Sequence, residues 1–283
     1  MFADAFAAER LRFSKARGTL FWAFLFVPIV SLVIGVATHI FFNVMIRKSG
    51  GRAADLATAP MDLARQAGEA MTGSNFFLIQ LFFMIGASAI MASDYRWETW
   101  RQLTPRNTRT NLLLAKLATF GVGAAAGVLL LALAGVLTGI AGALINGHPI
   151  VLSGSPAGLA LKQLAGGFII SWLELMVLGA FAAVVTVLTR SGLGAMLSAV
   201  GLSIVQAFVI SQLRMPDPGN PPLQYIAGLP AFAAELLRAT LLSGPMDPKP
   251  AGAAFALVFL LAWIAGLSAI AVLLFRRQDL TRE

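Results

Sequence analysis

Six long apolar runs constrain this chain more than any other feature of its sequence. They lie near residues 20–45, 73–93, 117–145, 164–188, 192–213 and 251–275. A helix needs about 20 mostly apolar residues to cross the hydrocarbon layer of a bilayer. The runs are continuous and do not alternate with polar residues, which favours helices over the strands of a membrane β-barrel. We therefore predict an all-α polytopic membrane protein, a six-span transmembrane helical bundle that forms a single domain over residues 1–283.

The composition agrees with lipid as the main solvent, because 58% of the residues are hydrophobic and 12% are charged. An ordinary soluble domain is about one-quarter charged. The net charge of +8 does not indicate nucleic acid as a partner, since the chain shows no soluble module with a basic, base-reading face. The sequence has no cysteine and two histidines, so we predict no disulfide, no cysteine nucleophile and no metal site.

The distribution of Lys and Arg predicts the orientation in the membrane. Six spans place both termini on the same side, and 13 of the 21 basic residues fall in the segments on that side. Because basic residues collect on the cytoplasmic side, we expect both termini in the cytoplasm of a bacterial cell, with the chain in the inner membrane. The uncharged stretch after residue 18 is too long for a cleaved signal, and residues 1–18 are expected to form an interfacial helix.

Two segments between spans need separate interpretations. In residues 146–163, Pro149 and Pro156 interrupt an otherwise uncharged stretch, which forms either an open loop or a re-entrant segment buried in protein. Residues 214–250 form the extracytoplasmic segment and include the stretch LPAFAAELLRATLL, whose apolar residues recur at helical spacing. We expect this stretch to be an amphipathic helix along the outer membrane surface.

Small residues recur at four-residue spacing within the third span, as Gly123 with Gly127 and Gly135 with Gly139. Such pairs let helix backbones approach closely in membranes. We interpret them as packing positions and not as a substrate groove.

Glu174, in the stretch SWLELMVLG, is the charged residue that lies deep within a span. An ionisable group there is costly and usually faces the bundle interior or a water-filled path. Glu174 is therefore a candidate transport-path residue, and a structural hydrogen bond is the alternative. The sequence shows no basic partner for it in another span.

Residues 93–117, SDYRWETWRQLTPRNTRTNLLLAKL, connect the second and third spans on the predicted cytoplasmic side. Ser93 or Asp94 can cap a helix and Pro105 cannot continue one, so a short helix over 94–104 is predicted. Trp97 and Trp100 share one face of that helix. They are either anchors at the level of the lipid headgroups or contacts for a partner.

This connection resembles the first cytoplasmic loop of the ABC-2 type permease family. That loop has an acidic residue, then a Thr-Trp or Gly-Thr pair, then a Pro and a basic residue, and a Lys that opens the third span. The matching residues are Asp94, Thr99, Trp100, Pro105, Arg109 and Lys116. The family usually has Glu at the position of Asp94 and Gly at the position of Glu98. The resemblance extends to the polar amphipathic start, the turn LTRSGLGA and the ending LLFRRQDL.

The resemblance implies that the chain is the membrane-spanning permease subunit of an ABC exporter. Two permease subunits, as a homodimer or a heterodimer, would assemble with two cytoplasmic ABC ATPase subunits, and residues 94–116 would form the cytoplasmic coupling-helix loop. The ATPase-coupling residues implied are Asp94, Trp97, Glu98, Thr99, Trp100, Arg101, Pro105 and Arg109. ATP would bind the partner, because this chain lacks a phosphate-cradling loop. We therefore predict that the chain is not an enzyme and holds no cofactor.

A second class of function remains open from the sequence. A proton- or ion-coupled secondary transporter could use Glu174 as its coupling acid. Such transporters often contain internal repeats, and the two halves of this chain show no convincing repeat. An ATPase encoded beside this chain would favour the ABC permease over the secondary transporter.

Overall fold

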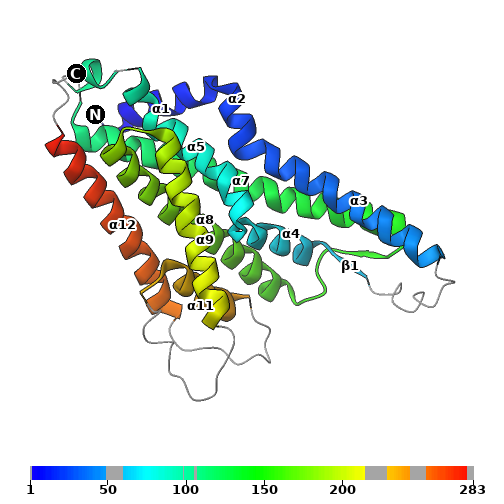
Figure 1. The fold of residues 1–283 in the computed structure, drawn as a ribbon. Helices are drawn as coiled ribbons and strands as arrows, with labels where there is room; N and C mark the ends of the chain where they lie inside the picture. The colour runs from blue at the N-terminus through cyan, green and yellow to red at the C-terminus, as the bar shows by residue number, and fades with distance from the viewer. Residues whose placement is uncertain are drawn as a thin grey trace.

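A computed structural model describes residues 2–48, 60–97, 99–104, 107–213, 228–242 and 253–278 (Figure 1). Within these ranges, six helices are long and apolar enough to cross a membrane. They are Arg17–Ile46, Phe77–Arg96, Arg109–Asn146, Ala157–Thr189, Gly192–Ser211 and Ala253–Arg277. The prediction of an all-α bundle with six such helices is confirmed. The largest differences from the predicted bounds are at the starts of the third and fourth helices, which begin eight and seven residues earlier than predicted.

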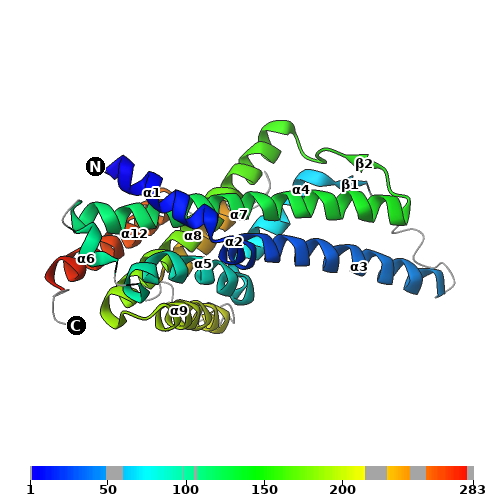
Figure 2. The same ribbon diagram turned by 90° about the horizontal axis from the view of Figure 1, so that it is seen from above.

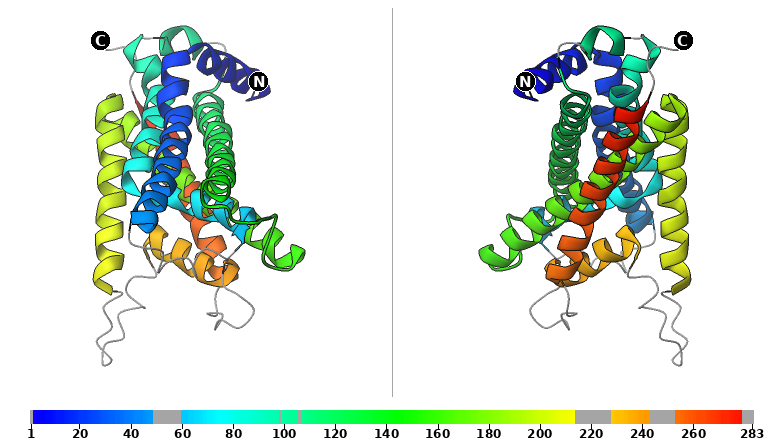
Figure 3. Two further views of the ribbon diagram at one scale, coloured as in Figure 1. Left: turned by 90° about the vertical axis from the view of Figure 1, so that its right-hand side faces the viewer. Right: turned by 90° about the vertical axis from the view of Figure 1, so that its left-hand side faces the viewer.

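The spans are built from α2 (Arg17–Leu20), a π-helical stretch (Phe21–Leu25), α3 (Phe26–Lys48), α5 (Phe77–Arg96), α7 (Arg109–Asn146), α8 (Ala157–Thr189), α9 (Gly192–Leu213) and α12 (Ala253–Arg277). The shorter elements are α1 (Phe2–Lys15), α4 (Leu63–Thr72), a 3-10 turn (Gly73–Asn75), α6 (Trp100–Leu103), α11 (Pro230–Leu241) and the strands β1 (Met61–Asp62) and β2 (Ile150–Val151). Figures 1 and 3 show α1, α6 and the last turn of α12 at one end, which we call the terminal end. The opposite end holds α4 and α11.

Close packing explains the small residues of α7. A Cβ atom placed on Gly123 would lie 2.7 Å from the ring of Phe24, and one on Gly135 would lie 2.5 Å from the backbone oxygen of Gln66 in α4. Both distances are below van der Waals contact, so a larger side chain would push the helices apart. The interpretation of these glycines as packing positions is confirmed. Figure 2 shows α3 and α7 running side by side along the bundle.

The helix α4 and the strand before it lie in a segment for which the sequence predicted no helix. Asp62 caps α4, because its Oδ1 accepts a hydrogen bond from the backbone N–H of Arg65 at 3.0 Å. Its Oδ2 accepts from the backbone N–H of Gly154 at 2.7 Å, and β1 pairs in parallel with β2. Residues 146–163, for which a loop and a re-entrant segment were both open, thus form an ordered connection that is bonded to the start of α4.

The helix α11 lies within the stretch LPAFAAELLRATLL, so the predicted short helix is confirmed, and it packs against the bundle. Ala233, Ala234 and Leu237 are buried against the bundle, where α11 contacts α8 and α12. Two of these residues are alanines, whose small side chains let α11 approach its neighbours closely. The helix therefore packs on the bundle at the opposite end, and its charged residues Glu235 and Arg238 line a cavity there.

Candidate functional site

The loop between α5 and α7 is shorter and more tightly folded than the sequence predicted. The span α5 continues through Arg96, so Asp94 lies in its last turn and does not cap a new helix. After a turn, α6 contains four residues where a helix over 94–104 was expected. The difference arises because the backbone N–H of Thr99 bonds back to the carbonyl of Asp94 at 3.1 Å, which ends α5 before α6 begins.

The two tryptophans of this loop have opposite surroundings. Trp97 is 71% exposed, whereas Trp100 is 3% exposed. The ring of Trp100 packs on Phe275 of α12, with centroids 4.4 Å apart, and on Tyr95 at 5.5 Å. The expectation that both tryptophans project toward a partner is therefore wrong for Trp100, because α12 covers it. Trp97 remains the exposed aromatic residue of the pair, with the guanidinium of Arg96 5.4 Å from its ring centroid.

Arg109, at the start of α7, forms hydrogen bonds with the end of α12. Its Nη1 donates hydrogen bonds to the backbone carbonyls of Phe275 at 3.0 Å, Arg276 at 3.2 Å and Gln278 at 2.7 Å. The last carbonyls of a helix have no partner within the helix, and a cation there also meets the negative end of the helix dipole. The structure thus gives Arg109 a C-capping role within the chain. Glu98, Pro105 and the side chain of Arg101 lie outside the described residues.

Four charged residues at the terminal end form a network, which we call the ionic cluster: Glu9, Arg12, Asp94 and Lys116. Glu9, Asp94 and Lys116 are buried, whereas the side chain of Arg12 is 45% exposed. Lys116 is fully buried, and its Nζ lies 2.8 Å from Asp94 Oδ2 and 3.1 Å from Glu9 Oε2. Arg12 Nη1 lies 3.1 Å from Asp94 Oδ1 and 3.2 Å from Glu9 Oε1. Two cations therefore balance two carboxylates.

Hydrogen bonds from neutral groups add to this network. Lys116 Nζ donates to the carbonyl oxygen of Ile90 at 2.9 Å and is bonded to Ser93 Oγ at 3.1 Å. The hydroxyl of Thr99 donates to the carboxylate of Asp94. Trp100 covers the cluster, with its ring centroid 5.4 Å from Lys116 Nζ. Such bonds offset part of the desolvation cost of a buried ion pair. The cluster joins α1, α5, α7 and the loop that contains α6.

The sequence identified part of the ionic cluster. Asp94, Thr99 and Lys116 belong to the motif of the loop, and the structure brings them together. Glu9 and Arg12 were not identified, because Glu9 interrupts the apolar stripe of α1 and was not paired with a cation. The position of Glu9 on the apolar face of α1 could have indicated this pairing, because a carboxylate buried on a helix face needs a cation opposite it.

A cavity of about 920 Å³ adjoins the ionic cluster. It lies between α1, the end of α5 and the start of α9, and its lining includes Asp94, Trp97 and Arg190. The terminal end therefore offers a concave surface with an exposed aromatic residue and basic groups directly beside the buried charges.

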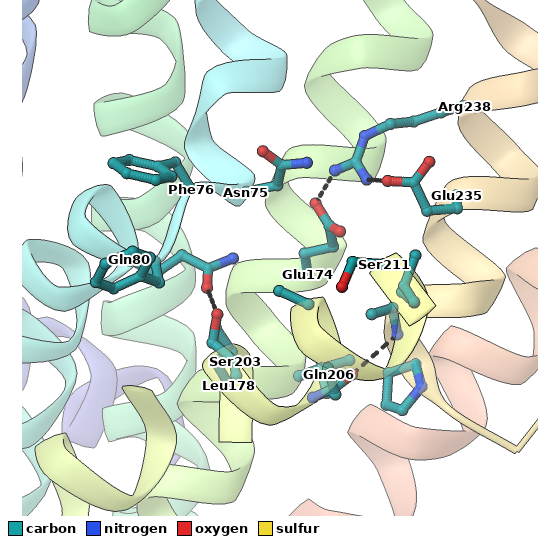
Figure 4. A pocket seen from close by; sticks show the side chains of 16 residues that line it. Asn75, Phe76, Gln80, Glu174, Leu178, Ser203, Gln206, Ser211, Glu235 and Arg238 are labelled. Atoms are coloured by element: carbon teal, nitrogen blue, oxygen red, sulfur yellow. Dashed lines mark hydrogen bonds and ion pairs between the residues drawn. The ribbon is translucent and has the colours of Figure 1, made fainter. Parts of the chain in front are cut away.

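Glu174 lies on the wall of a second cavity, of about 360 Å³, which we call the polar cavity (Figure 4). Its side chain is 11% exposed and forms an ion pair with Arg238 of α11. Arg238 Nη1 also lies 3.2 Å from Glu235 Oε1. The basic partner of Glu174 was not found from the sequence because it lies outside the spans, in a helix that was expected on the membrane surface.

Amides and hydroxyls occupy the rest of the polar wall. The hydroxyl of Ser203 donates to Gln80 Oε1, which links α9 to α5. Gln206 Oε1 accepts from the backbone N–H of Ala231 at 3.0 Å, which satisfies one of the free N–H groups at the start of α11. Figure 4 shows the labelled side chains gathered around Glu174. They come from the 3-10 turn and the start of α5, and from α8, α9 and α11.

Within the described part of the chain, no group of three or more His, Cys, Asp or Glu residues could hold a metal ion. Comparisons of the sequence with models of protein families and with curated proteins gave no match in either case. What the chain does must therefore be inferred from the geometry of the ionic cluster and the polar cavity.

Proposed function

We propose that this chain is the membrane-spanning permease subunit of an ATP-driven transporter of the ABC-2 type, and that it exports its substrate across the bacterial cytoplasmic membrane. A second permease subunit, identical or related, completes the pathway. Two ABC ATPase subunits bind ATP and dock on the terminal end. This chain binds neither ATP nor another cofactor.

The ionic cluster is the observation that supports this proposal most strongly. A permease driven by a separate ATPase needs a cytoplasmic surface that moves together with its spans. Ion pairs of 2.8 to 3.1 Å join α1 to the spans α5 and α7. The loop between these spans is joined to the cluster by the hydrogen bond from the hydroxyl of Thr99 to Asp94. Removing one member of a buried pair commonly costs about 3–5 kcal/mol, so these elements resist separation. A displacement applied to the loop would therefore reach α5 and α7.

The terminal end also carries features that suit a docking surface. Trp97 is 71% exposed beside the cavity of about 920 Å³. Aromatic residues that enter a partner's pocket supply much of the energy of protein interfaces. The excess of basic residues on this side favours its placement in the cytoplasm, where an ATPase would meet it.

Recovery of an ABC ATPase encoded beside this chain tests the proposal. The tagged chain should retain the ATPase through purification, and Trp97→Ala should weaken this binding by about thirtyfold, since truncating an anchor commonly costs about 2 kcal/mol. Trp22→Ala is the matched control, because Trp22 is 47% exposed but lies on the first span. Failure of the wild-type chain to retain or stimulate any such ATPase would refute the proposal. If the Trp97→Ala chain retains as much ATPase as the wild-type chain, Trp97 is not part of the interface.

A further inference from the structure

Basic residues gather where the first span begins. Four of them fall between positions 10 and 17: Arg10, Arg12, Lys15 and Arg17. Arg12 belongs to the ionic cluster, where it forms two ion pairs. The other three, which we call the basic surface, are exposed, and their side chains form no ion pair within the described part of the chain. Clusters of about four to eight Lys and Arg beside a membrane span are typical of segments that bind anionic lipid.

The aromatic residues of the first span indicate the depth of these charges in the membrane. Trp22 is 47% exposed and Phe21 is 39% exposed, and their ring centroids are 5.4 Å apart. An exposed tryptophan on a span usually lies at the boundary between the lipid headgroups and the hydrocarbon. At a rise of about 1.5 Å per residue, Arg17 lies about 7.5 Å from Trp22 along the helix. The headgroup layer is about 5–8 Å thick on each side of a bilayer, so Arg17 lies at the level of the lipid phosphates.

A bend before the first span keeps the other two charges close to this level. The helical backbone is interrupted at Ala16, whose φ and ψ are −81° and 63°. Figure 3 shows α1 crossing the terminal end at an angle to the first span. Arg10 and Lys15 therefore do not continue away from the membrane along the axis of that span.

The exposed side of α1 combines these charges with an apolar residue. Ala5 and Glu9 bury one side of α1 in the bundle, whereas Leu11 is 61% exposed and lies between Arg10 and Lys15 in the sequence. On interfacial helices, apolar side chains enter the acyl chains while Lys and Arg remain among the headgroups. A soluble anion would use the charges of this surface but would not use Leu11 or Trp22.

We propose that the basic surface binds the headgroups of anionic phospholipids at the terminal end, and that Leu11 and Trp22 contact the acyl chains of the same lipids. One Lys or Arg near an anionic membrane surface strengthens binding by about fivefold. The inference requires that the first span crosses a bilayer, and it depends neither on an ATPase nor on a transported substrate.

Energy transfer to lipid in nanodiscs tests this inference. Because the chain has no native cysteine, Ser14→Cys on the exposed side of α1 places a donor fluorophore at one site. The acceptor is attached to an acyl chain of phosphatidylglycerol or of phosphatidylcholine, so that each headgroup stays native. Either labelled lipid is present at the same low fraction in a phosphatidylcholine bilayer. We expect phosphatidylglycerol to be enriched beside the donor by at least about fivefold over phosphatidylcholine.

Matched variants assign the enrichment to the basic surface. Combining Arg10→Gln, Lys15→Gln and Arg17→Gln should abolish it, and these exposed side chains have no ion pair whose loss would disturb the fold. Arg10→Lys with Arg17→Lys should retain it, because the charges remain. Lys162→Gln is the control for charge alone and should leave the enrichment unchanged, since Lys162 is exposed at the start of α8, at the opposite end.

Three results would overturn the inference. The first is equal transfer to both lipids, and the second is an enrichment that persists when all three basic residues are Gln. The third uses excess glycerol phosphate, which has an anionic phosphate but no acyl chains. Loss of the enrichment in its presence would show that these residues bind a soluble anion, whereas an unchanged enrichment would support a bound lipid.

Discussion

Replacing Lys116 by Met removes the central cation of the ionic cluster while it nearly preserves the length of the side chain. At an effective dielectric constant of about 20, the attraction at 2.8 Å between Lys116 and Asp94 is about 6 kcal/mol, and the attraction at 3.1 Å to Glu9 is about 5 kcal/mol. Desolvation cancels part of each attraction. Both carboxylates are almost fully buried and would lose a partner. We therefore expect the free energy of unfolding to fall by about 3–5 kcal/mol.

Unfolding of the purified chain in mixed micelles, followed by tryptophan fluorescence, measures this change. Lys162→Met is the matched control, because Lys162 is exposed at the start of α8 and should alter the stability by at most about 0.5 kcal/mol. Adding Glu9→Gln and Asp94→Asn to Lys116→Met should recover part of the loss, since the unpaired charges are then removed. A loss below about 1 kcal/mol in Lys116→Met, similar to that of the control, would refute the stabilising role of the cluster.

The burial difference between the loop tryptophans predicts that Trp100→Ala costs about 3–5 kcal/mol of stability, while Trp97→Ala costs at most about 0.5 kcal/mol in the same unfolding assay. Equal losses would contradict the packing of Trp100 beneath α12. A single cysteine at position 97, in a chain without native cysteine, should react with a membrane-impermeant label after permeabilisation and not in intact cells; labelling from outside would overturn the predicted orientation. A proton gradient without ATP should drive no transport, and transport under that condition that is lost in Glu174→Gln would favour the ion-coupled alternative.

Hydropathy alone predicted the six membrane helices, because each is a local property of one continuous apolar run. Hydropathy did not predict α4, because this helix has only ten residues and is not a continuous apolar run. It ends in the 3-10 turn that leads into α5. An amphipathic helix of that length is below the length needed to span a bilayer. Its place in the bundle depends on contacts with Gly135, which are distant in sequence.

Some of the candidate residues could be predicted from a local motif, whereas contacts between residues distant in sequence could not. The loop motif identified Asp94, which the structure places in the ionic cluster. The burial of Trp100 could not be predicted, because the residue that covers it, Phe275, belongs to the last described helix. Likewise, Glu174 and Arg238 are 64 residues apart, and the sequence contains no pattern that joins them. Pairing between distant charges follows from the packing of helices, which a single sequence does not determine.

The contact between Arg109 and the end of α12 has a consequence for how the protein is made. Phe275 follows Arg109 by 166 residues, so the loop after α5 leaves the ribosome long before its partner exists. During that interval the indole of Trp100 and the guanidinium of Arg109 have no α12 to contact. The loop can reach its final conformation when α12 has been translated and inserted, and a chain truncated before that helix would display an uncovered aromatic surface. Burial of Trp100 beneath α12 would therefore distinguish molecules that contain this helix from molecules truncated before it.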